Sequence, residues 1–505
     1  MMNIIYPFIF SLFPLLSAYL TNFSQVPLAD TISPLLLIEL LTMSIYAISL
    51  LITRNFNKSS IITFIFLFFI FSFEPIFSPI RKIYPIEHVI KIYIYYFYIW
   101  VGLFIISIFA VFIFAKYLKA INLFLSVFTT ILVAITLIQI LLNVQKIYNS
   151  NFQNTDLNNI LASEEELSTT ELPDVYYIIL DRYLRADILQ SNYEYDNSKF
   201  INYLKEKGFY VVEKSHSNYL KTGHSLASSL NMRYINYLSE DVGESNNSWL
   251  PIYDLIKKNE VGLTFKHKGY KYIHIGSWWD PTRKNEYADI NINNNELSEF
   301  SDNIFRNTFF YPIKDTIFAE GIRKEQYNRT IYEIEYLKNI PLNKEPTFTF
   351  AHLLITHLPY VFAENGGFME GSGYDGKSES EIYVIQVKIA NKIMADLIED
   401  IIKKSETKPI IIVQSDEGNF PHGVSPLNYK FNWFEANQKQ IEEKFSILNA
   451  IYLPGENENV FKPELTPVNT FRIVFNELFN AKMELLPNES FLNQDDLHPY
   501  KFRKI

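Results

Sequence analysis

The residues best suited to chemistry are acids that directly follow apolar strands. The run 174–180 (DVYYIIL) leads into Asp181, and the run 409–415 (PIIIVQS) leads into Asp416 and Glu417. A rigid apolar strand that ends in a carboxylate is a good support for a metal ligand. Divalent ions such as Mg²⁺ and Mn²⁺ prefer oxygen ligands of this kind. These spacings therefore predict a metal site.

A hydroxyl-rich segment at 215–231 (SHSNYLKTGHSLASSLN) offers a nucleophile for this site. Thr222 stands where the pattern turns helical, and by itself it would be interpreted as a helix N-cap. Beside the strand-end acids it becomes a nucleophile that a divalent ion can activate by lowering the pKa of its hydroxyl. Phosphate and sulfate esters need this help, because their unaided hydrolysis is extremely slow. The set indicates ester transfer or hydrolysis.

Short apolar strands and the helices between them must position these residues. Near-continuous apolar runs suit central strands that are covered on both faces. The stripe of apolar residues over 381–403 recurs every three or four positions, which predicts a long helix. Such alternation predicts an α/β domain with helices on both sides of its sheet, where ligands bind beyond the carboxyl ends of the strands. The expected strands are 174–180, 271–275, 348–354, 409–415 and 446–452.

The N-terminal part of the chain has the composition of a membrane region. Five apolar stretches lie at about 4–21, 32–53, 60–80, 90–115 and 120–145. Each is near the roughly 20 residues that a helix needs to cross a bilayer. Glu39 and Glu74 lie within these stretches, where an acid either packs helices together or has a function. We expect a five-helix transmembrane region at 1–146, a polar linker at 147–172 and a soluble domain at 173–505.

Charge separates these parts. Residues 1–146 hold eight basic and four acidic side chains, and the remainder holds 37 basic and 51 acidic ones. Basic residues in the loops 54–59 and 116–119 favour a cytoplasmic N-terminus and an extracytoplasmic C-terminal domain, although the basic loop at 81–91 counts against it. The location expected is the plasma (inner) membrane.

Composition also excludes several classes of function. The net charge of −10 argues against a general nucleic-acid binder, which would carry a basic excess. The chain has no Cys, which excludes disulfides, cysteine zinc sites and thiol catalysis.

Six motifs in the soluble domain together resemble the alkaline phosphatase/sulfatase superfamily. The closer resemblance is to its membrane-anchored branch, which includes lipoteichoic acid synthases and phosphoethanolamine transferases. That branch implies an α/β/α sandwich with a mainly parallel sheet, tethered by five membrane helices. The motifs are PDVYYIILDRY (173–183), SNYLKTGHSLASSLN (217–231), IGSWWDPTR (275–283), THLPYVF (356–362), VQSDEG (413–418) and TPVNTFRIVFN (466–476).

The resemblance implies roles for individual residues. Asp181 and Asp416 would be metal ligands. Thr222 would be both a ligand and the nucleophile that transiently carries the transferred group. His357 would bind a substrate oxygen or assist the leaving group.

Other positions match the family less closely. Trp279 and Arg283 fall where the synthases place substrate-contacting residues. Glu417 stands where the family usually has His, so the site would offer only oxygens and prefer Mn²⁺ or Mg²⁺, or else Ca²⁺, over Zn²⁺. His422, five residues further on, could supply a nitrogen or contact the substrate.

The leading hypothesis is a membrane-anchored, metal-dependent hydrolase or transferase. It would act on phosphate esters, with sulfate esters second, of lipid-linked or cell-envelope substrates such as glycans, and its partners would be the bilayer and that substrate. Formylglycine sulfatases start from Cys or Ser in a C/S-x-P-x-R motif, which this chain lacks. The alternative is a catalytically silent binding or envelope-assembly component, which Glu417 in place of His would favour. A transporter is disfavoured because the spans show no repeat symmetry.

Overall fold

The computed structural model describes residues 2–81, 86–148, 172–294, 298–310, 321–370, 376–425, 428–455 and 460–505. The chain packs into two compact units. The first comprises Met1–Asn149 with Leu297–Ala319, and the second comprises Ser150–Glu296 with Glu320–Ile505. The linker predicted at 147–172 falls mostly on 149–171, outside the described residues, so this boundary stays a prediction.

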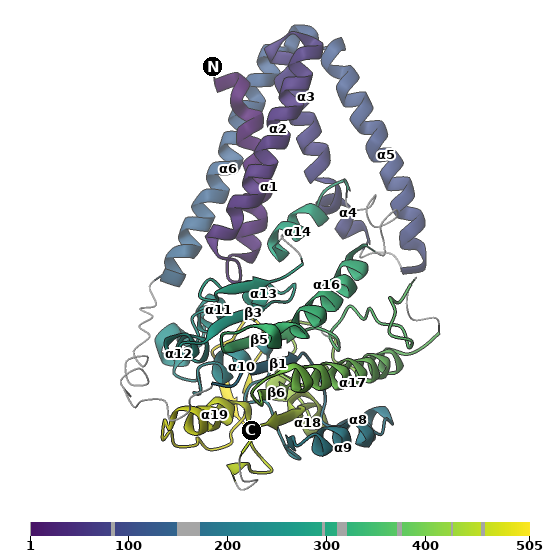
Figure 1. Ribbon diagram of the computed structural model, residues 1–505. Helices are drawn as coiled ribbons and strands as arrows, with labels where there is room; N and C mark the ends of the chain where they lie inside the picture. The colour runs from purple at the N-terminus through teal and green to yellow at the C-terminus, as the bar shows by residue number, and fades with distance from the viewer. Residues whose placement is uncertain are drawn as a thin grey trace. The chain divides into compact units, whose positions relative to one another are not determined.

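The first unit is built mainly of long apolar helices, purple to blue in Figure 1. They are α1 (Met2–Asn22), α2 (Ile32–Thr53), α3 (Phe56–Phe71), α4 (Phe73–Arg81), α5 (Ile86–Ile113) and α6 (Leu118–Tyr148). Four described stretches are long and apolar enough to cross a membrane, and the pair α3–α4, bent by 41°, raises the number to five if it counts as one span. The predicted region of apolar helices is confirmed.

One acid within these helices is held by a neighbouring helix. Ser11 Oγ in α1 donates a hydrogen bond of 2.5 Å to Glu39 Oε1 in α2. A carboxyl group among membrane helices is costly unless it has a polar partner. The contact therefore supports the helix-packing interpretation of Glu39.

A segment from the middle of the chain packs with the N-terminal helices. It contains α14 (Glu299–Arg306), whose Phe300 and Ile304 are buried in a cluster with side chains of the first unit. The Phe300 ring meets the Tyr19 ring edge-on, with centroids 6.4 Å apart. The two buried residues are four positions apart and so share one face of the helix. The predicted soluble domain at 173–505 includes α14, whereas the described contacts of this helix are with the first unit.

The second unit contains a seven-stranded sheet with the order β2-β7-β6-β1-β5-β3-β4. Its strands are β1 (Val175–Leu180), β2 (Tyr210–Val211), β3 (Lys271–Ile275), β4 (Ile290–Ile292), β5 (Thr347–Leu353), β6 (Ile410–Gln414) and β7 (Asn449–Tyr452). Both antiparallel pairings of the described sheet, β2 with β7 and β6 with β7, involve β7, and the other four pairings are parallel, so the predicted mainly parallel sheet is confirmed. β2 and β4 were not predicted, because strands of two or three residues carry no readable pattern.

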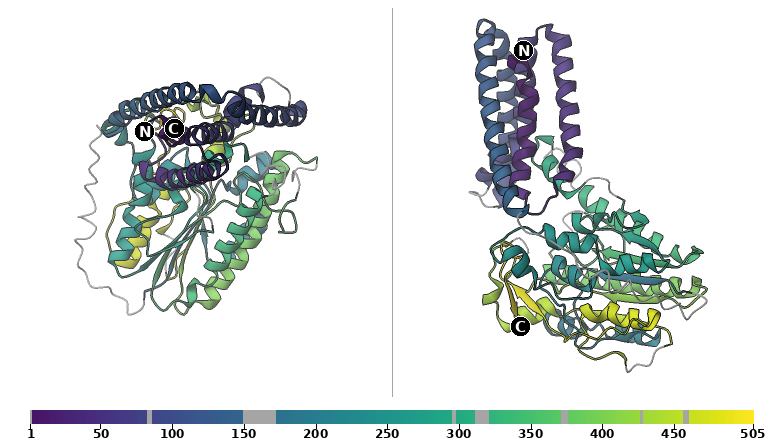
Figure 2. Two further views of the ribbon diagram at one scale, coloured as in Figure 1. Left: turned by 90° about the horizontal axis from the view of Figure 1, so that it is seen from above. Right: turned by 90° about the vertical axis from the view of Figure 1, so that its left-hand side faces the viewer.

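Helices cover both faces of this sheet. Alternate side chains of β1 enter two separate apolar cores: Tyr176, Ile178 and Leu180 enter one, and Val175, Tyr177 and Ile179 enter the other. Figure 2 (left) shows the green helix α17 on one side of the sheet and teal and yellow helices on the other. The first core includes α8 (Ala186–Tyr193), α9 (Ser198–Glu206), α16 (Gly321–Leu337) and α17 (Glu379–Lys404). The second includes α10 (Thr222–Ser229), α11 (Leu250–Lys257), α12 (Glu260–His267) and α19 (Thr470–Phe479).

The strand register brings chemically useful ends together. β1 lies between β5 and β6 and runs parallel to both. Leu180 pairs with Leu353, and Ile179 pairs with Gln414. The chain therefore leaves all three strands at the same edge of the sheet, which is where the ligands of open α/β sheets bind.

The α17 packing gives a stability prediction. Leu397 in α17 is fully buried in the first core, and Leu342 is 68% exposed. Leu397→Ala should destabilise the second unit by about 2–5 kcal/mol through lost burial and a residual cavity. Leu342→Ala should stay within about 0.5 kcal/mol of the wild type. Urea denaturation of the full chain in detergent, followed by Trp fluorescence, measures both; equal midpoints would contradict the assigned core.

Candidate metal centre

Three buried side chains from adjacent strands form a group that could hold a metal ion. They are Asp181 after β1, His352 within β5 and Asp416 after β6, and their potential ligand atoms all lie within 4.8 Å of one another. Both acids were predicted from the sequence, but His352 was not. The signal was a single imidazole in a strand that is otherwise uncharged, and only the register, which pairs His352 with Ile179, reveals that it lies beside Asp181.

The carboxylates of Asp181 and Asp416 are buried and incompletely hydrogen-bonded. Asp181 Oδ1 and Asp416 Oδ2 are buried without a hydrogen-bond partner among the described residues. Burial, and then the charges of Asp181 and Glu417, raise the pKa of Asp416 to about 7. A buried carboxylate oxygen without a partner is costly. A cation placed between these oxygens would remove that cost, so the residues present fit a metal ion.

His352 is held in an orientation suited to a ligand. Its Nε2 lies 3.1 Å from Asp181 Oδ2, and its Nδ1 lies 2.8 Å from Thr282 Oγ1. Thr282 Oγ1 is in turn 2.9 Å from Ser277 Oγ. When Nδ1–H donates to Thr282, the lone pair of Nε2 faces the carboxylates, which is the tautomer that a metal needs. Thr282 thus orients the imidazole from outside the site.

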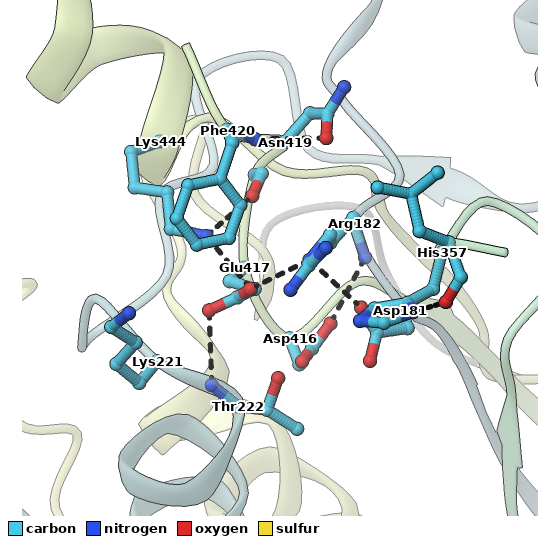
Figure 3. A network of polar contacts seen from close by, with 12 residues as sticks. Asp181, Arg182, Lys221, Thr222, His357, Asp416, Glu417, Asn419, Phe420 and Lys444 are labelled. Atoms are coloured by element: carbon cyan, nitrogen blue, oxygen red, sulfur yellow. Dashed lines mark hydrogen bonds and ion pairs between the residues drawn. The ribbon is translucent and has the colours of Figure 1, made fainter. Parts of the chain in front are cut away.

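Thr222 lies beside this group as the first residue of α10. Figure 3 shows its hydroxyl pointing toward Asp416, and this hydroxyl counteracts part of the rise in the Asp416 pKa by hydrogen bonding. Its backbone N–H donates a hydrogen bond of 3.1 Å to Glu417 Oε2. The hydroxyl is therefore turned toward the carboxylates by the way the helix begins.

Glu417 differs from the other two acids because protein groups already pair both of its oxygens. Oε1 lies 2.8 Å from Lys444 Nζ and accepts a hydrogen bond of 3.1 Å from Arg182 Nε. Oε2 accepts from the Thr222 N–H. Burial would raise the pKa of Glu417, but the Lys444 and Arg182 charges outweigh it and hold the pKa below its usual value. The Glu417 carboxylate is therefore ionised, and protein groups already pair both of its oxygens.

His357 lies near the group as a neutral imidazole. Burial, aided by the Arg182 charge, lowers its pKa to about 4, against the opposing charge of Asp181. Its ring meets Trp278 edge-on, with centroids 5.6 Å apart. At neutral pH this side chain can donate or accept a hydrogen bond but does not carry a positive charge.

The remaining predicted residues lie further out. The Trp279 ring meets His352 edge-on at 6.2 Å, so it lines the metal group. Arg283 Nε instead donates to Asp280 Oδ1 at 2.9 Å, within the short helix α13 (Asp280–Arg283). The His422 ring is 60% exposed, lies 2.8 Å from Ser380 Oγ and lines a cavity of 390 Å³.

No family model and no curated protein matches this sequence. Solved structures with a similar fold include phosphoethanolamine transferase domains, proteins of the alkaline phosphatase superfamily and sulfatases.

Three of these structures illustrate the similarity. The C-terminal periplasmic domain of EcEptC from Escherichia coli in complex with Zn has 12% identity and a TM-score of 0.44, with 67% of this chain and 94% of that chain covered. The C-terminal periplasmic domain of phosphoethanolamine transferase EptC from Campylobacter jejuni has 13% identity and a TM-score of 0.36, with 65% of this chain and 95% of that chain covered. An alkaline phosphatase superfamily protein from Vibrio parahaemolyticus has 12% identity and a TM-score of 0.39, with 70% of this chain and 81% of that chain covered. Because these identities are so low, the chemistry of the site is inferred from this chain's own residues and not from the similar structures.

Metal content tests the assigned group. Full-length protein stripped with chelator and reloaded with Mn²⁺ should retain about one ion per chain, as measured by inductively coupled plasma mass spectrometry. Asp181→Asn and His352→Ala should each reduce the bound metal strongly, since each removes a ligand. His267→Ala, at an exposed position of α12, is the matched control and should bind like the wild type. Full metal retention in His352→Ala would contradict the assignment.

Proposed function

We propose that this protein is a membrane-anchored, metal-dependent transferase or hydrolase that uses Thr222 to attack phosphate esters. The supporting observation is the hydroxyl of Thr222 beside two buried carboxylates, each with one oxygen that has no hydrogen-bond partner among the described residues. Sulfate esters are the second substrate class. Phosphate and sulfate esters both bring charged oxygens that a cationic site can neutralise.

Asp181, His352 and Asp416 would hold the metal ion, with the Thr222 oxygen as a further ligand. The sequence offered only oxygens and so favoured Mn²⁺ or Mg²⁺ over Zn²⁺. His352 adds a nitrogen donor, which suits Mn²⁺ and Zn²⁺ better than Mg²⁺. Mn²⁺ is therefore the first ion to test. When bound, the ion would lower the pKa of the Thr222 hydroxyl and neutralise charge on the ester oxygens.

The chain's own residues would carry a two-step transfer. Thr222 Oγ1 forms a bond to phosphorus while the bond from phosphorus to the leaving oxygen breaks, and the hydroxyl proton leaves to solvent. His357, a neutral imidazole, donates a hydrogen bond to that leaving oxygen. A second hydroxyl, from an acceptor or from water, then attacks phosphorus and releases Thr222.

The outer residues would bind the rest of the substrate. Trp279 lies against His352 and would pack against the substrate. Arg283 would reach it only after releasing Asp280. His422 would contact it from its cavity.

We place this reaction at the plasma (inner) membrane. The apolar helices would anchor the protein with a cytoplasmic N-terminus, and the second unit would lie outside the membrane, as the basic loops favour. A tethered catalytic unit suits lipid-linked or envelope-bound substrates, including glycans, because both partners are confined to one surface.

A catalytically silent binding component is the alternative, and Glu417 in place of His is its support. The buried carboxylates of Asp181 and Asp416 argue against it. Unpaired buried oxygens destabilise a fold. A protein that only binds partners through its surface gains nothing from them.

Substitution of the nucleophile tests the proposal. Thr222→Ala should lower the turnover of bis(p-nitrophenyl) phosphate by Mn²⁺-loaded protein about 10³-fold or more, because the covalent step is lost. Thr222→Ser keeps a hydroxyl and should retain measurable activity. Both variants should unfold at the wild-type midpoint. Wild-type protein that cleaves no phosphomonoester, phosphodiester or lipid headgroup with Mn²⁺, Mg²⁺ or Zn²⁺ would refute the proposed function.

A further inference from the structure

Arg182 lies within the site with part of its guanidinium free. Its Nε donates to Glu417 Oε1 at 3.1 Å and lies 3.7 Å from Asp181 Oδ1. Its two terminal nitrogens have no hydrogen-bond partner among the described residues, and its side chain is 13% exposed. Figure 3 shows this guanidinium between Glu417 and Asp181, in the layer above Asp416 and Thr222.

The backbone at Arg182 is arranged to bring this side chain into the site. Its φ is +61°, in the left-handed region that non-glycine residues rarely adopt. Successive side chains of an extended strand point to opposite faces, so Asp181 and Arg182 would otherwise diverge. The turn lets both neighbours face the same site. Such a conformation costs about 1–3 kcal/mol, a strain that in proteins is concentrated at functional sites.

The neighbours of Arg182 fix its guanidinium in place. Its Cζ lies 4.7 Å from the centroid of the Phe420 ring, which stacks against the cation. Lys444 Nζ lies 4.1 Å from the same ring and 2.8 Å from Glu417 Oε1. Lys444 therefore helps to hold Glu417, and Glu417 holds Nε of Arg182. One edge of the guanidinium is fixed while the opposite edge stays open.

We infer that the open edge of Arg182 binds the non-bridging oxygens of the transferred phosphoryl group. This inference rests on the proposed function, because it assigns a role in the same site. A guanidinium presents paired N–H donors that match two oxygens of a phosphate, and it is always charged. Arg182 directly follows Asp181, a predicted metal ligand, and Figure 3 shows its side chain in the same site as Thr222. Its N–H donors are therefore available to a phosphoryl group carried on Thr222.

Glu417 acquires a different role from the one that the sequence suggested. Among the described residues, the polar contacts of its side chain go to Arg182, Lys444 and the Thr222 N–H. It is thus a positioning residue, which aligns the anion-binding arginine with the start of the nucleophile's helix. It needs no metal ion to satisfy its charge.

Phosphate binding and kinetics test the role of Arg182. The probe is inorganic phosphate, titrated into Mn²⁺-loaded full-length protein in detergent by calorimetry, alongside turnover of bis(p-nitrophenyl) phosphate. Arg182→Lys and Arg182→Gln should weaken phosphate binding about 10- to 100-fold, as expected for lost hydrogen bonds to a charged group, and should keep the bound Mn²⁺. Turnover should fall by about 10²-fold or more.

A matched control uses an arginine that also stacks on a phenylalanine but lies at the surface. Arg503 Cζ is 4.4 Å from the Phe434 ring centroid and is exposed. Arg503→Lys should bind phosphate and turn over substrate like the wild type. Wild-type phosphate affinity in Arg182→Gln would overturn the inference even if the wild type is active. Phosphate binding that depends on Arg182 in a protein without turnover would instead refute only the proposed function, and no phosphate binding by the wild type would overturn the inference.

The role of Glu417 has its own test. Glu417→Gln should keep the bound Mn²⁺ and raise KM for the ester, since Arg182 loses its ionic partner. Because that variant leaves Lys444 buried without a counter-charge, the double variant Glu417→Gln/Lys444→Met removes both charges and preserves folding. Loss of Mn²⁺ in a folded double variant would show that Glu417 is a ligand and would overturn its positioning role.

Discussion

Asp181 and Asp416 are buried close together, and each has one oxygen atom without a hydrogen-bond partner among the described residues. This arrangement follows from the register of three parallel strands, which end together at one edge of the sheet. Two carboxylates in that position repel each other and lose their hydration. A cation bound between them would compensate both charges, so a demand for positive charge shapes the rest of the site.

The surrounding residues meet the requirement for positive charge in two different ways. His352 offers a nitrogen donor that Thr282 orients, and an imidazole brings no further negative charge to the pair. Glu417 would add a third negative charge, but Lys444 and Arg182 neutralise it from the other side. The site thus separates into a part that could hold a metal ion and a part that supplies its own cations. Thr222 lies where the two parts meet, with its hydroxyl toward one and its N–H toward the other.

Much of this could be predicted from the sequence because it depends on local patterns. Apolar runs before Asp181 and Asp416 predicted both strands and their chemically useful ends, and the stripe over 381–403 predicted α17. Short strands such as β2 and β4 carry too few residues for a pattern. The grouping of α14 with the N-terminal helices could not be predicted either, because the pattern of an amphipathic helix shows that one face is apolar but not which surface that face will pack against.

Residue type and spacing along the chain were enough to predict a set of apolar helices, an α/β sheet covered by helices on both faces, and acids at its strand ends. Tertiary structure decided which of those residues share a site. His352 lies beside Asp181 only because β5 pairs with β1 in one register, and a shift by one residue would turn its imidazole to the opposite face. Glu417 looked like a substitute ligand in the sequence. The packing of α18 (Gln438–Phe445) brings Lys444 against it, and a contact between residues so far apart in the chain leaves no trace in either local sequence.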